Sequence, residues 1–377
     1  MKTSKYLNIL FAAAAAAACS GIPDGEYRIS GRLSDVPDGT VLQLYEHDGD
    51  LLHRAATDTV AEGRFAFAGE IASPGVVSLG SGDEGFPSCR LELWVAPGEE
   101  TEVVGHGRLI GTWEVRSDIP QQAEENGYRA VVAAQTDTLM RQLLAEQTVE
   151  RGPRKDSLRA ARLRTDERIA AKTVDYMRTA PVTPLWTEKF ARYASFLQYG
   201  YYSGSREALE ALFRRLPEAQ RQSEQGRRID AWLHPLPTVG PGDTMADDDL
   251  YDPEGGRHRL AELAGKYILL DFWSEGCGPC LRAAPELERV AELHAGRLVA
   301  VSVSLDEKEE RWRRFVARQD SKGLQWRDPR GTAGLYARYR GTALPWFVLI
   351  APDGRIEAVW DGYAEGELLQ ITNEKIG

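Results

Sequence analysis

The stretch from Tyr267 to Cys280 constrains this chain more than any other part of its sequence. It begins with an apolar run of strand length, Tyr267 to Trp273, and ends in a Cys-x-x-Cys pair, Cys277 and Cys280. A segment compatible with a helix, Leu281 to His294, follows. Two thiols three positions apart at a helix start can close a small disulfide, and the unpaired N–H groups and helix dipole there favour the thiolate of the first cysteine. The stretch therefore predicts a strand, a dithiol suited to thiol–disulfide exchange, and a helix.

Length, charge and cysteine usage narrow the possibilities. A chain of 377 residues predicts about two or three domains. The net charge of −11 argues against nucleic-acid partners and against a polybasic membrane patch. Four cysteines are too few for a disulfide scaffold, and they divide by position into Cys19, Cys89 and the Cys277/Cys280 pair. Because Cys89 lies among apolar residues, we expect it to be a buried, inert thiol.

Residues 1–19 have the features of an export signal. Two lysines precede an apolar stretch, Tyr6 to Ala18, that is too short to span a bilayer comfortably. The small residues before Cys19 resemble a bacterial lipobox, with Ala16 in place of the usual Leu, and this resemblance implies lipidation of Cys19. Ordinary cleavage at an Ala-x-Ala-like site and an uncleaved anchor are the alternatives. All three place the chain outside the cytoplasm, where disulfides are permitted.

Two segments with different hydrophobic patterns precede the Cys-x-x-Cys region. Residues 20–117 alternate apolar and polar positions between turn signals, which predicts a small all-β domain of about seven strands. Residues 118–234 are poor in Gly and repeat apolar residues at helical spacing, which predicts four or five helices. An aromatic cluster in this helical region is expected to be core or a packing face between domains, with a binding surface as the alternative: Phe190, Tyr193, Phe196, Tyr199, Tyr201 and Tyr202.

The linker from His234 to Gly242, with its proline steps and glycines, marks the start of a third region, residues 235–377. Strands and helices should alternate there in an α/β sheet with helices on both faces. The expected strands are Tyr267–Trp273, Leu298–Ser304, Trp346–Ile350 and Ile356–Trp360. The expected helices are Pro279–His294, Lys308–Arg318 and Thr332–Tyr339.

Three features of this region resemble the thioredoxin family: Asp271-Phe272-Trp273, Cys277-Gly278-Pro279-Cys280, and Leu344-Pro345 before a buried strand. Over about residues 240–377 the chain resembles thiol:disulfide oxidoreductases of the redoxin and TlpA-like type. The β-rich region resembles the N-terminal β-domain of exported bacterial lipoproteins that carry such modules, through Gly31, Asp38-Gly39-Thr40 and Pro97-Gly98. The resemblance implies a thioredoxin fold at the C-terminus, after a small all-β domain and an α-helical region.

The resemblance also implies roles for individual residues. Cys277 would attack a disulfide and Cys280 would resolve the mixed disulfide. Asp271 is a carboxylate inside an apolar strand, which is costly to bury without a purpose. In the family this acid exchanges protons with the resolving cysteine, and burial should raise its pKa. Pro345 would follow a cis bond and face the dithiol. The expected substrate-binding residues border the pair: Trp273, Gly276, Leu344 and Pro345.

Three departures from the family pattern refine these expectations. Gly276 replaces the tryptophan that usually precedes the first cysteine. Ala283 stands where the membrane-tethered reductases of cytochrome maturation carry a Glu, so haem-pathway work is not expected. The segment from Val301 to Leu305 has no lysine to pair with Asp271.

Three other interpretations compete with the dithiol enzyme. The first is a structural zinc site, which needs four ligands. The sequence has no second Cys-x-x-Cys pair and no histidines at ligand spacing, so we expect no metal, and no organic cofactor is needed. A peroxiredoxin-like peroxidase is an alternative, although Leu270 and Ser274 occupy the places of its Pro and Thr. A binding lipoprotein with an accessory redox module is another.

The sequence thus predicts a periplasm-facing thiol–disulfide oxidoreductase, lipid-anchored to a membrane, which we expect to be the outer one. Its partners would be protein thiols and disulfides and a membrane electron donor. The Gly-Pro dipeptide matches the reducing members of the family and favours a reductant or isomerase.

Overall fold

The computed structural model describes residues 21–48, 51–199, 205–319 and 323–377. The predicted export signal and its lipidation residue Cys19 lie outside these ranges, as do Tyr201 and Tyr202. Within the described residues, no helix is both long and apolar enough to cross a membrane. Apart from residues 48–51, the chain forms two compact units that divide between Gly127 and Tyr128.

The first unit is all-β. Two four-stranded sheets, in the orders β4-β1-β7-β8 and β3-β2-β5-β6, account for its strands. Their bounds are β1 (Glu26–Ser34), β2 (Val41–Asp48), β3 (Leu51–Thr59), β4 (Arg64–Glu70), β5 (Gly75–Gly80), β6 (Leu91–Val95), β7 (Glu100–His106) and β8 (Glu114–Arg116). In β1 the side chains of Tyr27, Ile29 and Leu33 are buried and their neighbours are exposed or partly exposed, as period-two alternation predicts. The expected β-rich region is therefore confirmed.

Cys89 packs against the core of this first unit and is partly buried. Burial raises the pKa of its thiol to about 11. The thiolate, which is the reactive form, is therefore scarce at neutral pH. The structure agrees with an inert thiol.

Six helices follow in the described part of the helical region: α1 (Pro120–Gln147), α2 (Pro153–Met177), α3 (Pro184–Tyr199), α4 (Arg206–Phe213), α5 (Glu218–Arg221) and α6 (Glu224–Leu233). The sequence predicted four or five. The unexpected boundary lies between α5 and α6, where the Ser223 side chain accepts a hydrogen bond from the Gly226 backbone N–H, at 3.1 Å. This N-cap starts a new helix within a short polar stretch that has no Gly or Pro break.

The described aromatic side chains of α3 are mainly packing residues. Phe190 is fully buried against Trp186, with ring centroids 5.3 Å apart. Tyr193 and Phe196 are half-buried and meet edge to face at 5.8 Å. These contacts favour the core interpretation over a binding surface.

The C-terminal region contains a seven-stranded mixed sheet in the order β10-β9-β13-β12-β11-β14-β15. Its strands are β9 (Leu250–Tyr251), β10 (Arg257–His258), β11 (Tyr267–Trp273), β12 (Leu298–Ser304), β13 (Leu324–Arg327), β14 (Trp346–Ile350) and β15 (Ile356–Asp361). β11, β12 and β13 are parallel, whereas β14 and β15 run antiparallel to their neighbours. All four predicted strands are present. The sequence missed β9, β10 and β13, which have too few residues to show a period.

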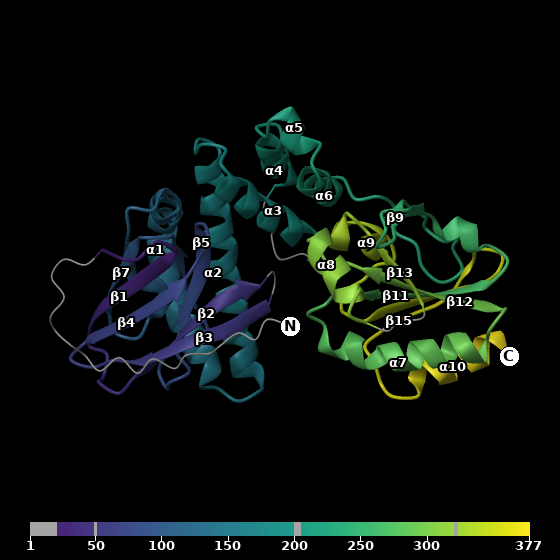
Figure 1. The fold of residues 1–377 in the computed structure, drawn as a ribbon, viewed down its shortest axis with the longest axis horizontal. Helices are drawn as coiled ribbons and strands as arrows, with labels where there is room; N and C mark the ends of the chain where they lie inside the picture. Colours follow the sequence, from purple (N-terminus) through teal and green to yellow (C-terminus); the bar gives the residue numbers. More distant parts are fainter. Residues whose placement is uncertain (1–20, 49–50, 200–204, 320–322) are drawn as a thin grey trace. The chain divides into compact units, whose positions relative to one another are not determined.

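Helices cover both faces of this sheet. α7 (Gly278–Leu293) and α10 (Glu367–Ile376) lie side by side and pack on the face that carries Leu269 and Leu349 (Figure 1). α8 (Glu309–Val316) reaches the same face through Trp312, which contacts Trp273. α9 (Leu335–Arg338) packs on the opposite face through Leu335. The thioredoxin fold class expected from the sequence is confirmed.

The prediction of one helix over Thr332–Tyr339 is wrong. A 3₁₀ turn, η3 (Gly331–Ala333), ends at Gly334 before α9 begins. The buried Asp328 carboxylate accepts the Leu335 backbone N–H at 2.7 Å, and a Cβ at Gly334 would lie 2.0 Å from that carboxylate. Gly334 is therefore needed where the carboxylate caps the second segment.

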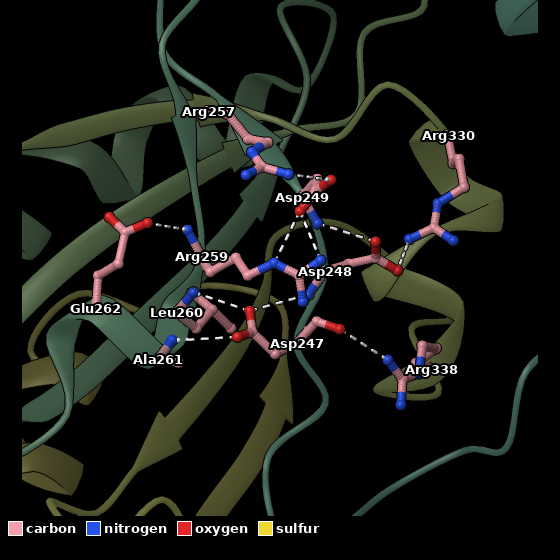
Figure 2. Close-up of polar contacts among 10 residues, drawn as sticks. All are labelled: Asp247, Asp248, Asp249, Arg257, Arg259, Leu260, Ala261, Glu262, Arg330 and Arg338. Carbon is pink, nitrogen blue, oxygen red and sulfur yellow. Dashed lines mark hydrogen bonds and ion pairs between the residues drawn. The ribbon is translucent and has the colours of Figure 1, made fainter.

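Three consecutive carboxylates secure the segment that precedes the sheet (Figure 2). Asp247 accepts the Leu260 backbone N–H at 2.9 Å, at the start of the 3₁₀ turn η2 (Leu260–Leu263). The other two bind arginines: Asp248 pairs with Arg330, and Asp249 with Arg257 and Arg259. These contacts fix the short strands β9 and β10, which have little pairing of their own.

Glu286 provides a test of how α10 is attached. This carboxylate on α7 is buried and accepts the backbone N–H groups of Gly366, at 2.8 Å, and Leu369, at 3.1 Å. Burial alone would raise its pKa, but these hydrogen bonds hold the pKa below the ordinary value. We expect Glu286→Ala to lower the free energy of unfolding by about 1–3 kcal/mol in urea titrations.

The stabilisation should also depend on pH. The pKa of Glu286 is lower in the folded than in the unfolded chain. Its contribution to the free energy of unfolding is therefore complete above the unfolded pKa of about 4.3 and is lost as pH falls below it. The difference between wild type and Glu286→Ala should therefore shrink in acid. The exposed residue Glu292, also on α7, gives the matched control Glu292→Ala, and an equal loss there would contradict the role of Glu286.

Candidate functional site

The two cysteines of the motif lie at the N-terminus of α7. They form a disulfide with Cα atoms 5.3 Å apart. Cys277 is the N-cap residue of the helix, and its sulfur accepts the Cys280 backbone N–H at 3.2 Å. Cys277 is partly exposed, whereas Cys280 is buried. When the pair is reduced, the N–H groups and dipole of this helix end stabilise a thiolate at Cys277, which is the sulfur that a partner can reach.

Asp271 lies on β11 with 4% of its surface exposed. Burial raises the pKa of this carboxyl to about 7, although a hydrogen bond from Ser302 opposes the rise. The Ser302 hydroxyl donates to Asp271 Oδ2 at 3.4 Å, and Oδ1 has no hydrogen-bond partner among the described residues. A carboxyl group with this pKa can both accept and release a proton near neutral pH.

Ser302 is a site residue that the sequence analysis missed. It lies directly opposite Asp271 in the pairing of β12 with β11. It stands in the segment that lacks the lysine expected of thioredoxins, so a neutral hydroxyl takes the place of a cation beside the acid. The sequence does place Ser302 on one face of β12, together with Ala300 and Ser304. The pairing of β12 with β11 and its register are needed to show that this face brings Ser302 next to Asp271.

A cavity of about 210 Å³ opens beside Asp271 and Cys280. Its floor is the sheet, with Asp271 and Ser302, and its walls come from α7 and from the C-terminal end of α8. The apolar wall residues are Trp273, Leu281, Ala284, Pro285, Phe315 and Val316. A cavity of this size has room for water, and the unpartnered Asp271 oxygen is a polar group that water can satisfy. The cavity therefore offers water a place beside the acid, and Cys277 is not among its lining residues.

α8 supplies aromatic residues that the sequence analysis did not assign to the site. Trp312 is buried with Trp273 and Cys280, and Phe315 packs on Trp273 with ring centroids 5.5 Å apart. Trp273 was expected among the substrate-binding residues, but it is 6% exposed and lies beneath the motif. Its position fits a role in shaping the apolar surroundings of Cys280.

The remaining expected residues are Leu344, Pro345 and Gly276, of which Leu344 packs in the same cluster as the two cysteines. The Leu344–Pro345 peptide bond is cis, as the resemblance implied. Pro345 is buried, and Leu344 is partly buried against the cluster that contains Cys277 and Cys280. Gly276 is exposed directly before Cys277. A partly exposed sulfur beside Gly276 and Leu344 is accessible to an extended chain.

Nothing in the described part of the chain gathers three or more His, Cys, Asp or Glu side chains in a metal-binding arrangement. His258 stacks on Trp326 and bonds Asp252 at 2.9 Å, and His234 bonds Asp230 at 2.9 Å. Their hydrogen bonds give both histidines a structural role.

Comparison with known proteins agrees with this geometry. Residues 265–356 match a family model described as thioredoxin-like. This part of the chain is a thioredoxin-like domain. A thioredoxin from Acidithiobacillus ferridurans is 38% identical over 63 residues, which are 17% of this chain and 58% of that relative. A thiol-disulfide oxidoreductase from Geobacillus thermodenitrificans is 38% identical over 68 residues, which are 17% of this chain and 39% of the relative.

Among solved structures, the thioredoxin domain of a thiol-disulfide oxidoreductase from Bacteroides vulgatus is similar, with 26% identity and a TM-score of 0.33. The match covers 37% of this chain and 99% of that one. The two curated relatives named above are thus a thioredoxin and a thiol-disulfide oxidoreductase.

The Ser302 hydrogen bond can be tested through the pH dependence of the dithiol. Because this bond lowers the pKa of Asp271, Ser302→Ala should raise that pKa further above its value of about 7. The pH midpoint at which Cys280 resolves a mixed disulfide should then move to higher pH in stopped-flow measurements. The Asp271→Asn variant should lose this pH midpoint altogether. Adding Ser302→Ala to Asp271→Asn should then change the pH dependence no further. An unchanged midpoint in Ser302→Ala would remove the proposed link.

Proposed function

We propose that this protein is a thiol–disulfide oxidoreductase that exchanges disulfides with protein substrates. The observation that carries the proposal is the Cys277–Cys280 disulfide at the N-terminus of α7, with the buried Asp271 carboxyl and Cys280 bordering one cavity. The relatives of the thioredoxin-like domain support the same chemistry. The dithiol is itself the redox group.

The reaction proceeds in two exchange steps. The Cys277 thiolate attacks one sulfur of a substrate disulfide, so that a mixed disulfide forms and a substrate thiolate leaves. Cys280 then gives its proton to Asp271, and its thiolate attacks Cys277. This closes the Cys277–Cys280 disulfide and releases the second substrate thiolate. Two electrons pass to the substrate, and a dithiol donor must restore the reduced pair.

We further propose that the protein works in the reducing or isomerising direction, facing the periplasm. The Gly278-Pro279 dipeptide between the cysteines supports this direction. The export signal and Cys19 support a lipid anchor, expected in the outer membrane, with a membrane protein as electron donor. The β-rich first unit would then belong to the class of N-terminal domains that accompany such modules in exported lipoproteins.

A glutathione redox titration of the full-length chain, with thiol trapping and mass measurement, tests the activity. A reversible two-electron couple near the thioredoxin potential of about −270 mV would support a reductant, and a much more oxidising potential would favour an oxidase or isomerase. A pair that does not titrate would overturn the enzyme proposal in favour of a binding lipoprotein.

The roles of the two cysteines predict different outcomes for two matched variants. Cys277→Ala should abolish exchange, because no accessible thiolate remains to attack. Cys280→Ala should accumulate mixed disulfides with substrate proteins, because the resolving thiol is missing. Non-reducing gels and mass spectrometry of the trapped species distinguish the two. Cys89→Ala is the control and should behave as wild type, because that thiol is partly buried with a raised pKa. Equal trapping by both motif variants would contradict the order of attack.

The anchor can be tested separately in a bacterial host. Radiolabelled fatty acid should be incorporated into the wild-type chain and not into Cys19→Ser. The variant should also leave the membrane fraction. Incorporation that persists in Cys19→Ser would place the lipid elsewhere, and membrane association without any label would favour the uncleaved anchor.

A further inference from the structure

The strongest unassigned feature is a chain of polar contacts between the helical region and the loop before Cys277, centred on the buried side chain of Arg327. It begins at α6, where Glu224 forms an ion pair with Arg327 of β13. Arg327 has 2% of its side chain exposed. Burying a guanidinium is costly without a compensating charge, and breaking such a pair leaves that charge uncompensated. The nearest carboxylate of the thioredoxin-like domain, on Glu309, lies 3.8 Å away.

Arg327 in turn holds the segment that follows β12. Its Nε donates to the Asp306 carbonyl at 3.0 Å, and its Nη2 donates to the Glu307 carbonyl at 3.1 Å. A second arginine, Arg228 of α6, reaches the Glu307 carboxylate at 3.3 Å. Two side chains of one helix in the helical region therefore act on the same turn of the thioredoxin-like domain.

That turn binds the loop that leads into the redox motif. The buried Asp306 carboxylate accepts the Glu275 backbone N–H, at 3.1 Å and 3.3 Å from its two oxygens, and the Ser304 hydroxyl at 2.8 Å. The Glu275 side chain accepts a hydrogen bond from Arg311 Nε at 2.5 Å. Glu275 is two residues before Cys277, whose own backbone N–H donates to the Ser274 carbonyl at 3.0 Å.

We infer that α6 is a positioning element of the redox centre, acting through Glu224, Arg327 and Asp306. This inference rests on the proposed function and gives one helix of the helical region a place in it. Glu224 and Arg327 are positioning residues, because neither borders the disulfide. Holding the loop before Cys277 keeps the two sulfurs close, so less conformational entropy is lost when the disulfide closes. Releasing the loop should make closure less favourable.

The test is Glu224→Gln in the full-length chain, which removes the charge with little change in volume. We expect the equilibrium constant for forming the Cys277–Cys280 disulfide against glutathione to fall about threefold to tenfold. The rate at which a small alkylating reagent labels Cys277, measured against pH, should also change. Both measurements are made under native conditions, where a purely stabilising contact would leave them unaltered.

Glu207→Gln is the matched control. Glu207 lies in the first turn of α4 and Glu224 in the first turn of α6, so both variants lose the same charge at a helix N-terminus, but Glu207 is exposed whereas Glu224 is partly buried. The control should keep the wild-type equilibrium constant and alkylation profile. Circular dichroism should show the same folded content in both variants.

Arg327→Lys is the second variant. Lysine keeps the positive charge but lacks the planar fork that bonds two carbonyls and a carboxylate together. The equilibrium constant should fall in the same direction as in Glu224→Gln. Combining the two substitutions should add little to the larger single effect, because they interrupt one path. If Arg327→Lys does not fold, Glu224→Gln decides the question.

The outcomes separate this inference from the proposed function. A wild-type pair that titrates, with Glu224→Gln unchanged in both measurements, would overturn the positioning role and leave the enzyme intact. A wild-type pair that fails to titrate would overturn both.

Discussion

The burial of one carboxyl group organises the candidate site. Asp271 lies inside a hydrophobic strand, and desolvation raises its pKa to about 7. Such a group is costly to bury, and the surrounding structure limits the cost with the Ser302 hydroxyl and a cavity large enough for water. The same strand leads directly to the helix whose N-terminus carries Cys277. Asp271, Cys280 and Cys277 are therefore positioned by one strand–helix connection.

The crossover from β12 to β13 completes these surroundings. α8 lies within this crossover and places Trp312 against Trp273 and Cys280, which keeps the resolving sulfur apolar and buried. Phe315 lines the cavity next to Asp271. This one crossover thus supplies both the apolar surroundings of Cys280 and part of the cavity wall beside Asp271.

The turn that begins this crossover also receives the contacts from α6. The buried Arg327 on β13 has one ion-pair partner in its own domain, Glu309 at 3.8 Å, and Glu224 of the helical region supplies a second carboxylate. The helical region therefore contributes to the electrostatics of the thioredoxin-like domain. This relation explains why Arg228 of α6, which reaches the Glu307 carboxylate, is buried.

The sequence by itself determined the local features of this protein. One short stretch of sequence contains the apolar run to Trp273, the Cys-x-x-Cys pair and the helix after it. Periodicity and the residues typical of a helix start were therefore sufficient to predict these features. The strands β9, β10 and β13 were missed because they are too short to show a period. The sixth helix and the break at Gly334 were missed because a hydroxyl or carboxylate cap defines each boundary more than any period. Tertiary structure alone decided that Ser302 faces Asp271 and that Glu224 reaches Arg327. Such pairs are distant in sequence and follow from strand register and helix packing, which no local pattern encodes.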